Sequence, residues 1–174
     1  MILATTRALV QLFKSMEPNT HLSQGSIVEL AKLPAIILTG PVVSEVLRRQ
    51  RDAERITVID ENNRIAVHEK SPRWYNMQFG VALSCAANMD LLKLMESCSR
   101  LPQQYPVIKA VGEERTREYS WGWRSFPSAY PAPNASEVIE GRGELMVYDV
   151  EVYSDLRETV SLVEAFELGE IDVE

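Results

Sequence analysis

The sequence has few residues that bind metals or form disulfide bonds: two histidines and two cysteines among 174 residues. Cys85 and Cys98 do not form a Cys-x-x-Cys pair, so neither a disulfide framework nor a zinc site is predicted. We expect two buried thiols in a reducing compartment, because free cysteine usually packs as a small hydrophobic residue. His21, in a predicted polar loop, and His68, in a predicted hairpin, have no companions at metal-ligand spacing, so both are interpreted as surface or edge residues.

Catalytic motifs are also missing. The sequence has no glycine-rich dinucleotide or phosphate loop, no Gly-x-Ser-x-Gly and no His-Glu-x-x-His, so we predict no catalytic residue, no metal and no cofactor. The acids Glu113, Glu114, Asp149 and Glu151 are candidates for acid–base chemistry. A solvated acidic face explains them better, because chance pairs are common where acids are frequent. Glu164 interrupts an apolar alternation, and it must reach solvent, pair with a base or meet an interface.

No apolar run reaches the roughly 18 residues of a transmembrane helix, and the N-terminus lacks the pattern of a secretory signal. We therefore expect a protein that is intracellular when made and has no membrane partner. The length and the 45% hydrophobic content suit one compact domain over residues 1–174.

Charge is unevenly distributed along the chain. Residues 1–87 carry 10 basic and 8 acidic side chains, whereas residues 88–174 carry 8 basic and 17 acidic ones. From Glu137 to the last residue, the sequence has twelve acidic residues and only two basic ones, Arg142 and Arg157. A surface of that sign repels phosphate, so tight nonspecific binding of nucleic acid is disfavoured. This charge is still compatible with an acidic surface that DNA passes without being bound.

The first half of the sequence predicts one helix and several strands. Apolar residues at helical spacing predict a helix over residues 2–16, and residues 26–31 and 34–39 predict short strands, the second stopped by Gly40 and Pro41. Residues 42–52 fit either a short helix or a loop. Two β-rich segments, 56–59 and 65–67, flank an Asx-rich turn and predict a hairpin.

The clearest pattern is the alternation of apolar and small or polar residues over 75–85, which predicts a strand with one core face. Asn88 is the expected N-cap of a following helix that Pro102 ends. The buried stripe of this helix is expected to contain Leu91, Leu94, Met95, Cys98 and Leu101.

The rest of the chain predicts further strands. A short strand is expected at 107–111, and a polar and aromatic excursion follows at 112–136, with a strand-like piece at 119–123 and an irregular segment at 126–134. Strands over 145–153 and 160–168 close the chain, and the alternation of the first slips near Asp149, where a bulge would re-aim the side chains. The expected fold is α+β, with a mostly antiparallel sheet packed by two main helices.

Two sets of residues are candidates for protein interfaces. Trp121, Trp123 and Arg124 fit either core packing or a partner surface, with ligand or nucleic-acid stacking as a further alternative. Arg48, Arg49 and Arg51 fit a solvated loop, or a contact with the acidic C-terminal half of a neighbouring copy.

The order of these elements resembles the tail terminator or tail completion (head–tail joining, neck) proteins of tailed bacteriophages. The resemblance lies mainly in residues 73–106, with 74–83 and 89–96 as the most similar stretches, and in residues 144–153 near the end. It is one of pattern rather than of a signature motif, and the excursion at 112–136 departs from it.

The resemblance implies a structural virion protein without catalysis, located in the tail or neck and made in the bacterial cytoplasm. Such a protein forms a ring, usually of six copies, that caps the tail tube and joins it to the head connector while DNA passes through without specific binding. Alternatives are another neck or baseplate protein of a phage, or a small α+β enzyme or ligand-binding protein with scattered site residues.

Overall fold

The computed structural model describes residues 1–23, 32–49, 54–60, 65–112, 115–129, 138–153, 157–161 and 171–172. Its internal contacts divide the chain into two compact units. Unit 1 contains residues 1–44 and 75–150, and unit 2 contains residues 45–74 and 151–174. The fold is α+β, and the expectation of a single domain stays a prediction.

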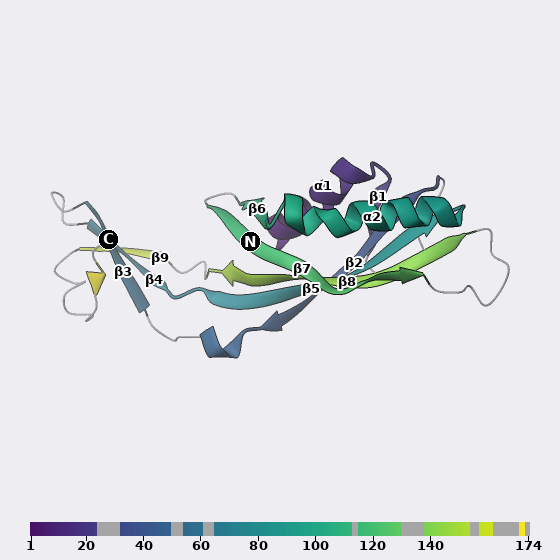
Figure 1. The fold of residues 1–174 in the computed structure, drawn as a ribbon. Helices are drawn as coiled ribbons and strands as arrows, with labels where there is room; N and C mark the ends of the chain where they lie inside the picture. The colour runs from purple at the N-terminus through teal and green to yellow at the C-terminus, as the bar shows by residue number, and fades with distance from the viewer. Residues whose placement is uncertain are drawn as a thin grey trace. The chain divides into compact units, whose positions relative to one another are not determined.

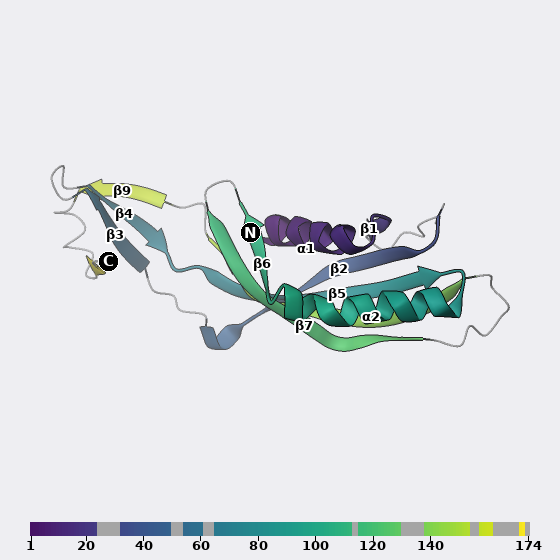
Figure 2. The ribbon, with the colours of Figure 1, turned by 45° about the horizontal axis from the view of Figure 1, so that its top comes forward.

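Unit 1 contains two helices and the six-stranded, mixed sheet, in the order β1-β2-β5-β8-β7-β6. Strand β1 pairs with β2 in parallel, whereas β7 pairs antiparallel with both β6 and β8. Thr39 lies beside Gly80, and Ser44 lies beside Asn76. Residue numbers therefore rise along β2 where they fall along β5, so these two strands are antiparallel as well. This sheet is compatible with the mostly antiparallel one that was predicted. Both helices lie on the same face of it (Figures 1 and 2).

The predicted N-terminal helix is confirmed as α1, Ile2–Met16. Leu9 and Phe13 are fully buried, and Leu12 and Met16 are half-buried, as the spacing indicated. The helix is followed by β1, Thr20–Ser23. His21 therefore lies in a strand and not in a loop, and its exposed ring is 2.7 Å from Oδ1 of Asn19.

Strand β2, Ala35–Glu45, continues past Gly40 and Pro41, which the sequence predicted to end it. Gly40 has a φ of 113°, which a glycine adopts without the steric cost that a Cβ would add. Pro41 is tolerated because β1 pairs with β2 only over Ile36–Thr39, so the missing N–H removes no bond to β1. The predicted strand at 26–31 lies outside the described residues.

The long alternating strand is confirmed as β5, Arg73–Cys85, with its odd-numbered residues from Met77 onward buried. Strand β8, Ile139–Val152, shows the predicted slip: Leu145 and Val147 are buried, and the next buried residue is Val150. Asp149 takes a positive φ of 55° between them, and its N–H donates to the side-chain oxygen of Asn76 over 3.1 Å.

Helix α2, Asn88–Gln104, buries the predicted stripe, with Met95 half-buried and the others buried. Two predictions about its ends are wrong. The N-cap is Ala87, without a side-chain cap, rather than Asn88. Pro102 lies inside the last turn and does not end the helix.

A tryptophan explains why α2 continues through Pro102. Without an N–H, Pro102 cannot bond the carbonyl of Cys98, four residues earlier. The indole N–H of Trp123 donates to that carbonyl instead, over 3.3 Å. The carbonyl that the proline leaves free is thus satisfied from the sheet.

The short strand β6, Val107–Val111, is confirmed at the predicted bounds. Strand β7, Thr116–Ala129, contains the predicted piece at 119–123. It also continues through residues 126–129, which the sequence predicted to be irregular. Register shifts between Trp123 and Ser128 let it stay paired with β8 there.

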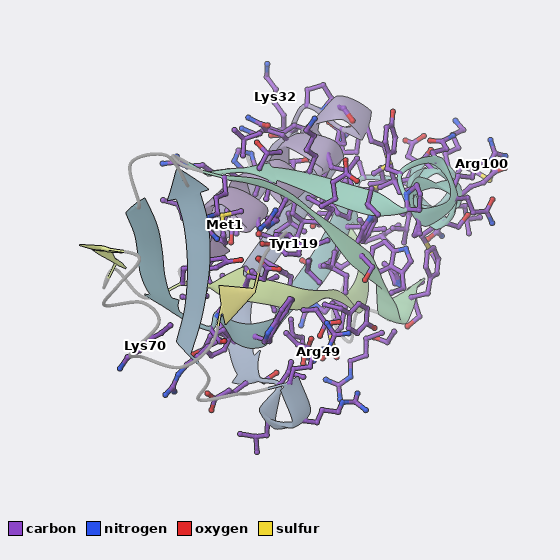
Figure 3. The ribbon with its side chains drawn as sticks, turned by 90° about the vertical axis from the view of Figure 1, so that its left-hand side faces the viewer. Met1, Lys32, Arg49, Lys70, Arg100 and Tyr119 are labelled. Carbon is purple, nitrogen blue, oxygen red and sulfur yellow. The ribbon has the colours of Figure 1, made fainter. Side chains whose placement is uncertain are left out.

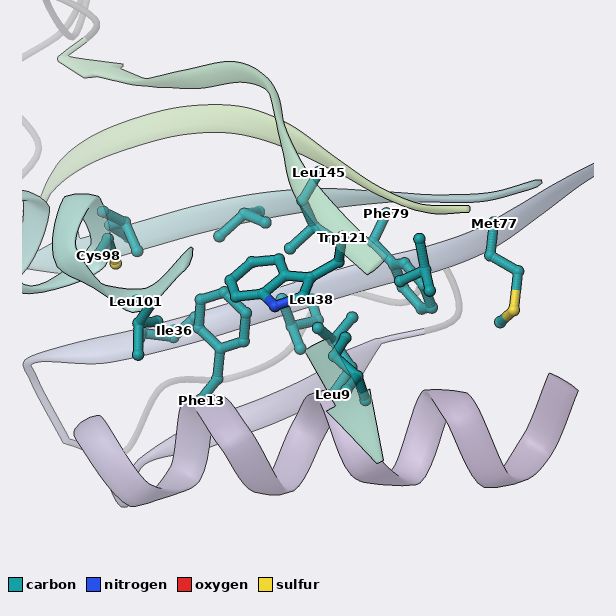
Figure 4. Packing of buried hydrophobic residues seen from close by; sticks show 14 of the residues in the cluster. Leu9, Phe13, Ile36, Leu38, Met77, Phe79, Cys98, Leu101, Trp121 and Leu145 are labelled. Carbon is teal, nitrogen blue, oxygen red and sulfur yellow. The ribbon is translucent and has the colours of Figure 1, made fainter. Parts of the chain in front are cut away.

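The core of unit 1 lies between the two helices and the sheet (Figure 4). Phe13 of α1 meets Trp121 and Trp123 edge-on, with ring centroids 6.2 Å apart in both pairs. Phe126 extends this aromatic cluster, at 5.3 Å from Trp123. The two tryptophans therefore connect β7 to both helices.

Unit 2 contains a short 3₁₀ helix η1, Leu47–Arg49, and a four-stranded sheet in the order β10-β3-β4-β9. The strand bounds are β3 Glu54–Asp60, β4 Ile65–Lys70, β9 Arg157–Ser161 and β10 Ile171–Asp172. Strands β3 and β4 pair antiparallel, which confirms the predicted hairpin and places His68 in it. Of the strand predicted at 160–168, residues 162–168 lie outside the described part.

We expect the stabilisation from the hydrogen bond between the Trp123 indole and the Cys98 carbonyl to depend on Pro102. In the wild-type background, Trp123→Phe should cost about 1 kcal/mol more of unfolding free energy than in a Pro102→Ala background, where residue 102 supplies the helical N–H. Urea denaturation of the four chains measures this coupling.

The matched control is Trp121→Phe in the same two backgrounds, because its indole N–H donates to the carbonyl of Tyr105 over 2.7 Å and not to Cys98. It should show no coupling. An equal cost of Trp123→Phe with proline or alanine at 102 would contradict our account of the helix end.

Candidate protein interface

The tryptophans of the predicted interface are on the helix-packed side of the sheet. Trp121 is buried and Trp123 is half-buried, and both donate hydrogen bonds to the last turn of α2 or to its C-cap. Of the alternatives that the sequence left open, core packing describes Trp121 within this chain. A partner contact for Trp123 stays a prediction.

Arg124 points to the opposite side of the sheet. Its guanidinium donates from Nη1 to Oε1 of Gln78 over 2.6 Å, and its Nε lies 3.9 Å from a carboxylate oxygen of Glu144. These three residues come from β7, β5 and β8, so they cross three adjacent strands. More than half of the Arg124 side chain stays exposed, so a partner can still reach it.

The predicted arginine cluster lies in unit 2. Arg48 and Arg49 are exposed on η1, and the Arg49 guanidinium lies 5.2 Å from the centre of the Trp74 ring. This distance is typical of a cation–π contact. Glu45 binds Arg73 over 3.3 Å in the same unit. Arg51 lies outside the described residues, as do Glu113, Glu114 and Glu164.

The two cysteines and Glu151, which were also considered for chemistry, are buried or hydrogen-bonded within the chain. Cys85 and Cys98 are free and buried, as predicted, and burial raises the pKa of the Cys98 thiol to about 12. The pKa of Cys85 is raised as well, by burial first and then by the charges of Asp90 and Glu17. Glu151 accepts a hydrogen bond from the Tyr153 hydroxyl over 2.7 Å.

No group of three or more potential metal ligands occurs among the residues that the structure describes. Among the described helices, none has the length and hydrophobicity needed to cross a membrane. An open pocket of about 260 Å³ lies between the C-terminal ends of α1 and α2. Its lining residues are Ser15, Met16, Ser97, Arg100, Leu101, Gln104 and Tyr105.

The side of the sheet away from the helices offers a second surface, which we call the outer face. Alternate residues of β5, β7 and β8 point to it, because their neighbours along each strand are buried against the helices. We define it by Gln78, Gly80, Gly122, Arg124, Glu144, Met146 and Tyr148.

Gly122 is the least expected residue of the outer face. It lies inside β7, opposite Met146, and its φ is not positive. A Cβ built at this position meets no atom within 4 Å. Nothing in the described fold of the chain therefore requires glycine, although glycine weakens a strand interior. Such a glycine often marks a place where another backbone or side chain approaches closely.

The remaining composition of the outer face is that of an interface. Met146 is half-buried, Tyr148 is 38% exposed, and both lie beside Gly122 on the sheet. Arg124 and Glu144 are the charged residues of this set, and Glu118 and Arg142, at the same strand parity, add further charge to this side of the sheet. Tyr, Met and Arg are enriched in the centres of protein interfaces, where Lys and Asp are depleted.

The outer side of α2 carries a third surface. Met89, Leu92, Lys93, Glu96 and Arg100 form one stripe at helical spacing, opposite the buried stripe. Met89 is 64% exposed and Leu92 is 56% exposed. Arg100 projects away from the sheet on this side (Figure 3). Further along α2, the same stripe contains Glu96 and Arg100, which form an ion pair.

The sequence reasoning found Arg124 but missed most of these two surfaces. A glycine between two tryptophans of the same strand parity was the available signal for Gly122. For α2, the signal was a pair of apolar residues, Met89 and Leu92, on the side away from the predicted buried stripe.

A comparison with known protein families and with curated protein sequences finds no match for this chain.

We expect the two strand glycines to differ in what they tolerate. Gly122→Thr should raise the unfolding free energy of the dilute chain by about 0.5–1 kcal/mol, because threonine favours strands and space is available. Gly40→Ala should lower it by roughly 1–3 kcal/mol, because the φ is positive and the Cβ would lie 2.9 Å from the Gln78 carbonyl oxygen. Urea denaturation checks both, and a loss of stability in Gly122→Thr would show that the glycine is needed by the fold itself.

Proposed function

We propose that the chain is a structural protein of a tailed-bacteriophage virion, which caps the tail tube as an oligomeric ring and joins it to the head connector. Its action is through protein surfaces. The observation that carries this proposal is the outer face, where an unexplained glycine is surrounded by Met146, Tyr148 and Arg124. The resemblance in the order of elements, over β5, α2 and β8, supports the same reading.

The partners under this proposal are other copies of the chain, the tail tube protein and a connector or neck protein. The resemblance implies a ring of six copies. The acidic second half of the sequence suits a channel through which DNA passes, because acidic side chains repel the phosphates. Another neck or baseplate protein would use the same kind of surface.

The test is negative-stain microscopy of the purified chain, alone at high concentration and with growing tail tubes. We expect closed rings, or tubes that stop growing and carry a ring at one end. A chain that leaves tube growth unchanged would contradict the capping function. Saturable binding of a small molecule at the pocket between α1 and α2, without any binding to tubes or connectors, would favour a ligand-binding protein instead.

The arginines of η1 provide a second test of assembly. If Arg48 and Arg49 contact the acidic half of a neighbouring copy, the double reversal Arg48→Glu, Arg49→Glu should weaken self-association at least tenfold and reduce its dependence on salt. Sedimentation over a range of salt concentrations measures both. Arg7→Glu on the exposed side of α1 is the matched control. Unchanged association of the double variant would remove these arginines from the interface.

A further inference from the structure

The outer face and the outer side of α2 lie on opposite sides of the same two-layer unit. The helices cover one face of the sheet, and α2 presents its exposed stripe away from that sheet (Figures 1 and 3). A surface on one side and a different surface on the other can join identical copies head to tail. Repetition of such a heterologous contact gives a ring when the rotation closes.

The two surfaces have complementary chemistry. Each has an apolar part, Met146 and Tyr148 on the sheet and Met89 and Leu92 on the helix. On the sheet, the space above Gly122 can receive a protruding side chain, because no atom of the described residues lies within 4 Å of a Cβ at this position. On the helix, Leu92 protrudes, with more than half of its surface exposed.

The charges continue the match. Next to its apolar part, the outer face carries one base and one acid, Arg124 and Glu144, which are 56% and 46% exposed. Next to Leu92, the helix carries Lys93 and Glu96, which are 71% and 63% exposed. Within one chain, Lys93 is paired with Asp90, Glu96 with Arg100 and Arg124 with Glu144. These exposed pairs can exchange partners across a contact, and opposite charges in such an arrangement set its register.

The spacing of the two patterns agrees as well. Gly122 and Arg124 are two residues apart on β7, which is about 6.6 Å. Leu92 and Glu96 are four residues apart on a helix, which is about 6 Å. A helix lying along β7 would bring Leu92 over Gly122 and Glu96 against Arg124.

We propose that the outer side of α2 of one copy packs on the outer face of the next copy, with Leu92 over Gly122 and the pair Lys93 and Glu96 against Glu144 and Arg124. The inference rests on the proposed function in that it takes the chain to assemble with itself. It adds which two surfaces meet and why the contact has a direction.

Two single variants and their mixture test the proposal. Gly122→Arg fills the receiving surface, and its Cβ meets no described atom within 4 Å. Leu92→Lys charges the inserting surface. Each variant alone should associate at least tenfold more weakly than the wild type in sedimentation equilibrium. Gln11→Lys, on an exposed position of α1, is the matched control and should associate as the wild type does, whereas Gly122→Ala should weaken association less than Gly122→Arg because it adds only one methyl group to the receiving surface.

The mixture gives the sharpest result. Each variant keeps one intact surface, so an equimolar mixture should form heterodimers at close to wild-type affinity and nothing larger, which native mass spectrometry resolves. A mixture that stays monomeric, or a Leu92→Lys chain that still forms rings, overturns the proposal; the second result would indicate a symmetric contact or another edge of the sheet. A wild-type chain that stays monomeric at every concentration also overturns it.

These failures are distinguishable from failure of the proposed function. Variants that assemble as well as the wild type refute the pairing of α2 with the outer face, while capping of tail tubes by the wild type would still stand. Failure of the wild type to act on tubes or connectors refutes the function, whichever surfaces join the copies.

Discussion

The hydrogen bonds from two indole N–H groups to the end of α2 hold the helix layer on the sheet. Trp121 and Trp123 reach from the middle of β7 to the carbonyls of Tyr105 and Cys98, and the ring of Phe13 brings α1 to the same place. Together with the burial of Leu91, Leu94, Cys98 and Leu101, these two bonds set which side of α2 faces away from the sheet. The surfaces proposed for assembly depend on this attachment, although neither tryptophan belongs to them.

The regular elements of unit 1 could be predicted well, because each has a core on one side only. Burial on one side leaves a period in the sequence, which is clear in β5, α1 and α2. The predictions failed where a proline that would normally end a helix or strand is tolerated because of the surrounding fold. Pro102 stays helical because Trp123 supplies the missing donor, and Pro41 stays in β2 because no bond to β1 is lost there. Neither compensation is visible in a window of a few residues.

The candidate site was less predictable than the fold, for a related reason. A surface is assembled from alternate residues of three strands that are far apart in the sequence, and nothing in the local pattern brings Gln78, Arg124 and Glu144 together. Only Arg124 was identified, from its aromatic neighbours. Those neighbours point to the other side of the sheet, so the structure separates Arg124 from the aromatic residues that suggested it, and its place in an interface stays a prediction.

Pro41 has a consequence for the edge of β2. In the described part of the chain, β1 does not pair with β2 beyond Thr39, and an unpaired strand edge is a template to which further copies of a chain can add without limit. A residue that cannot donate a backbone hydrogen bond interrupts such a template. The proline therefore discourages runaway aggregation through this edge of β2.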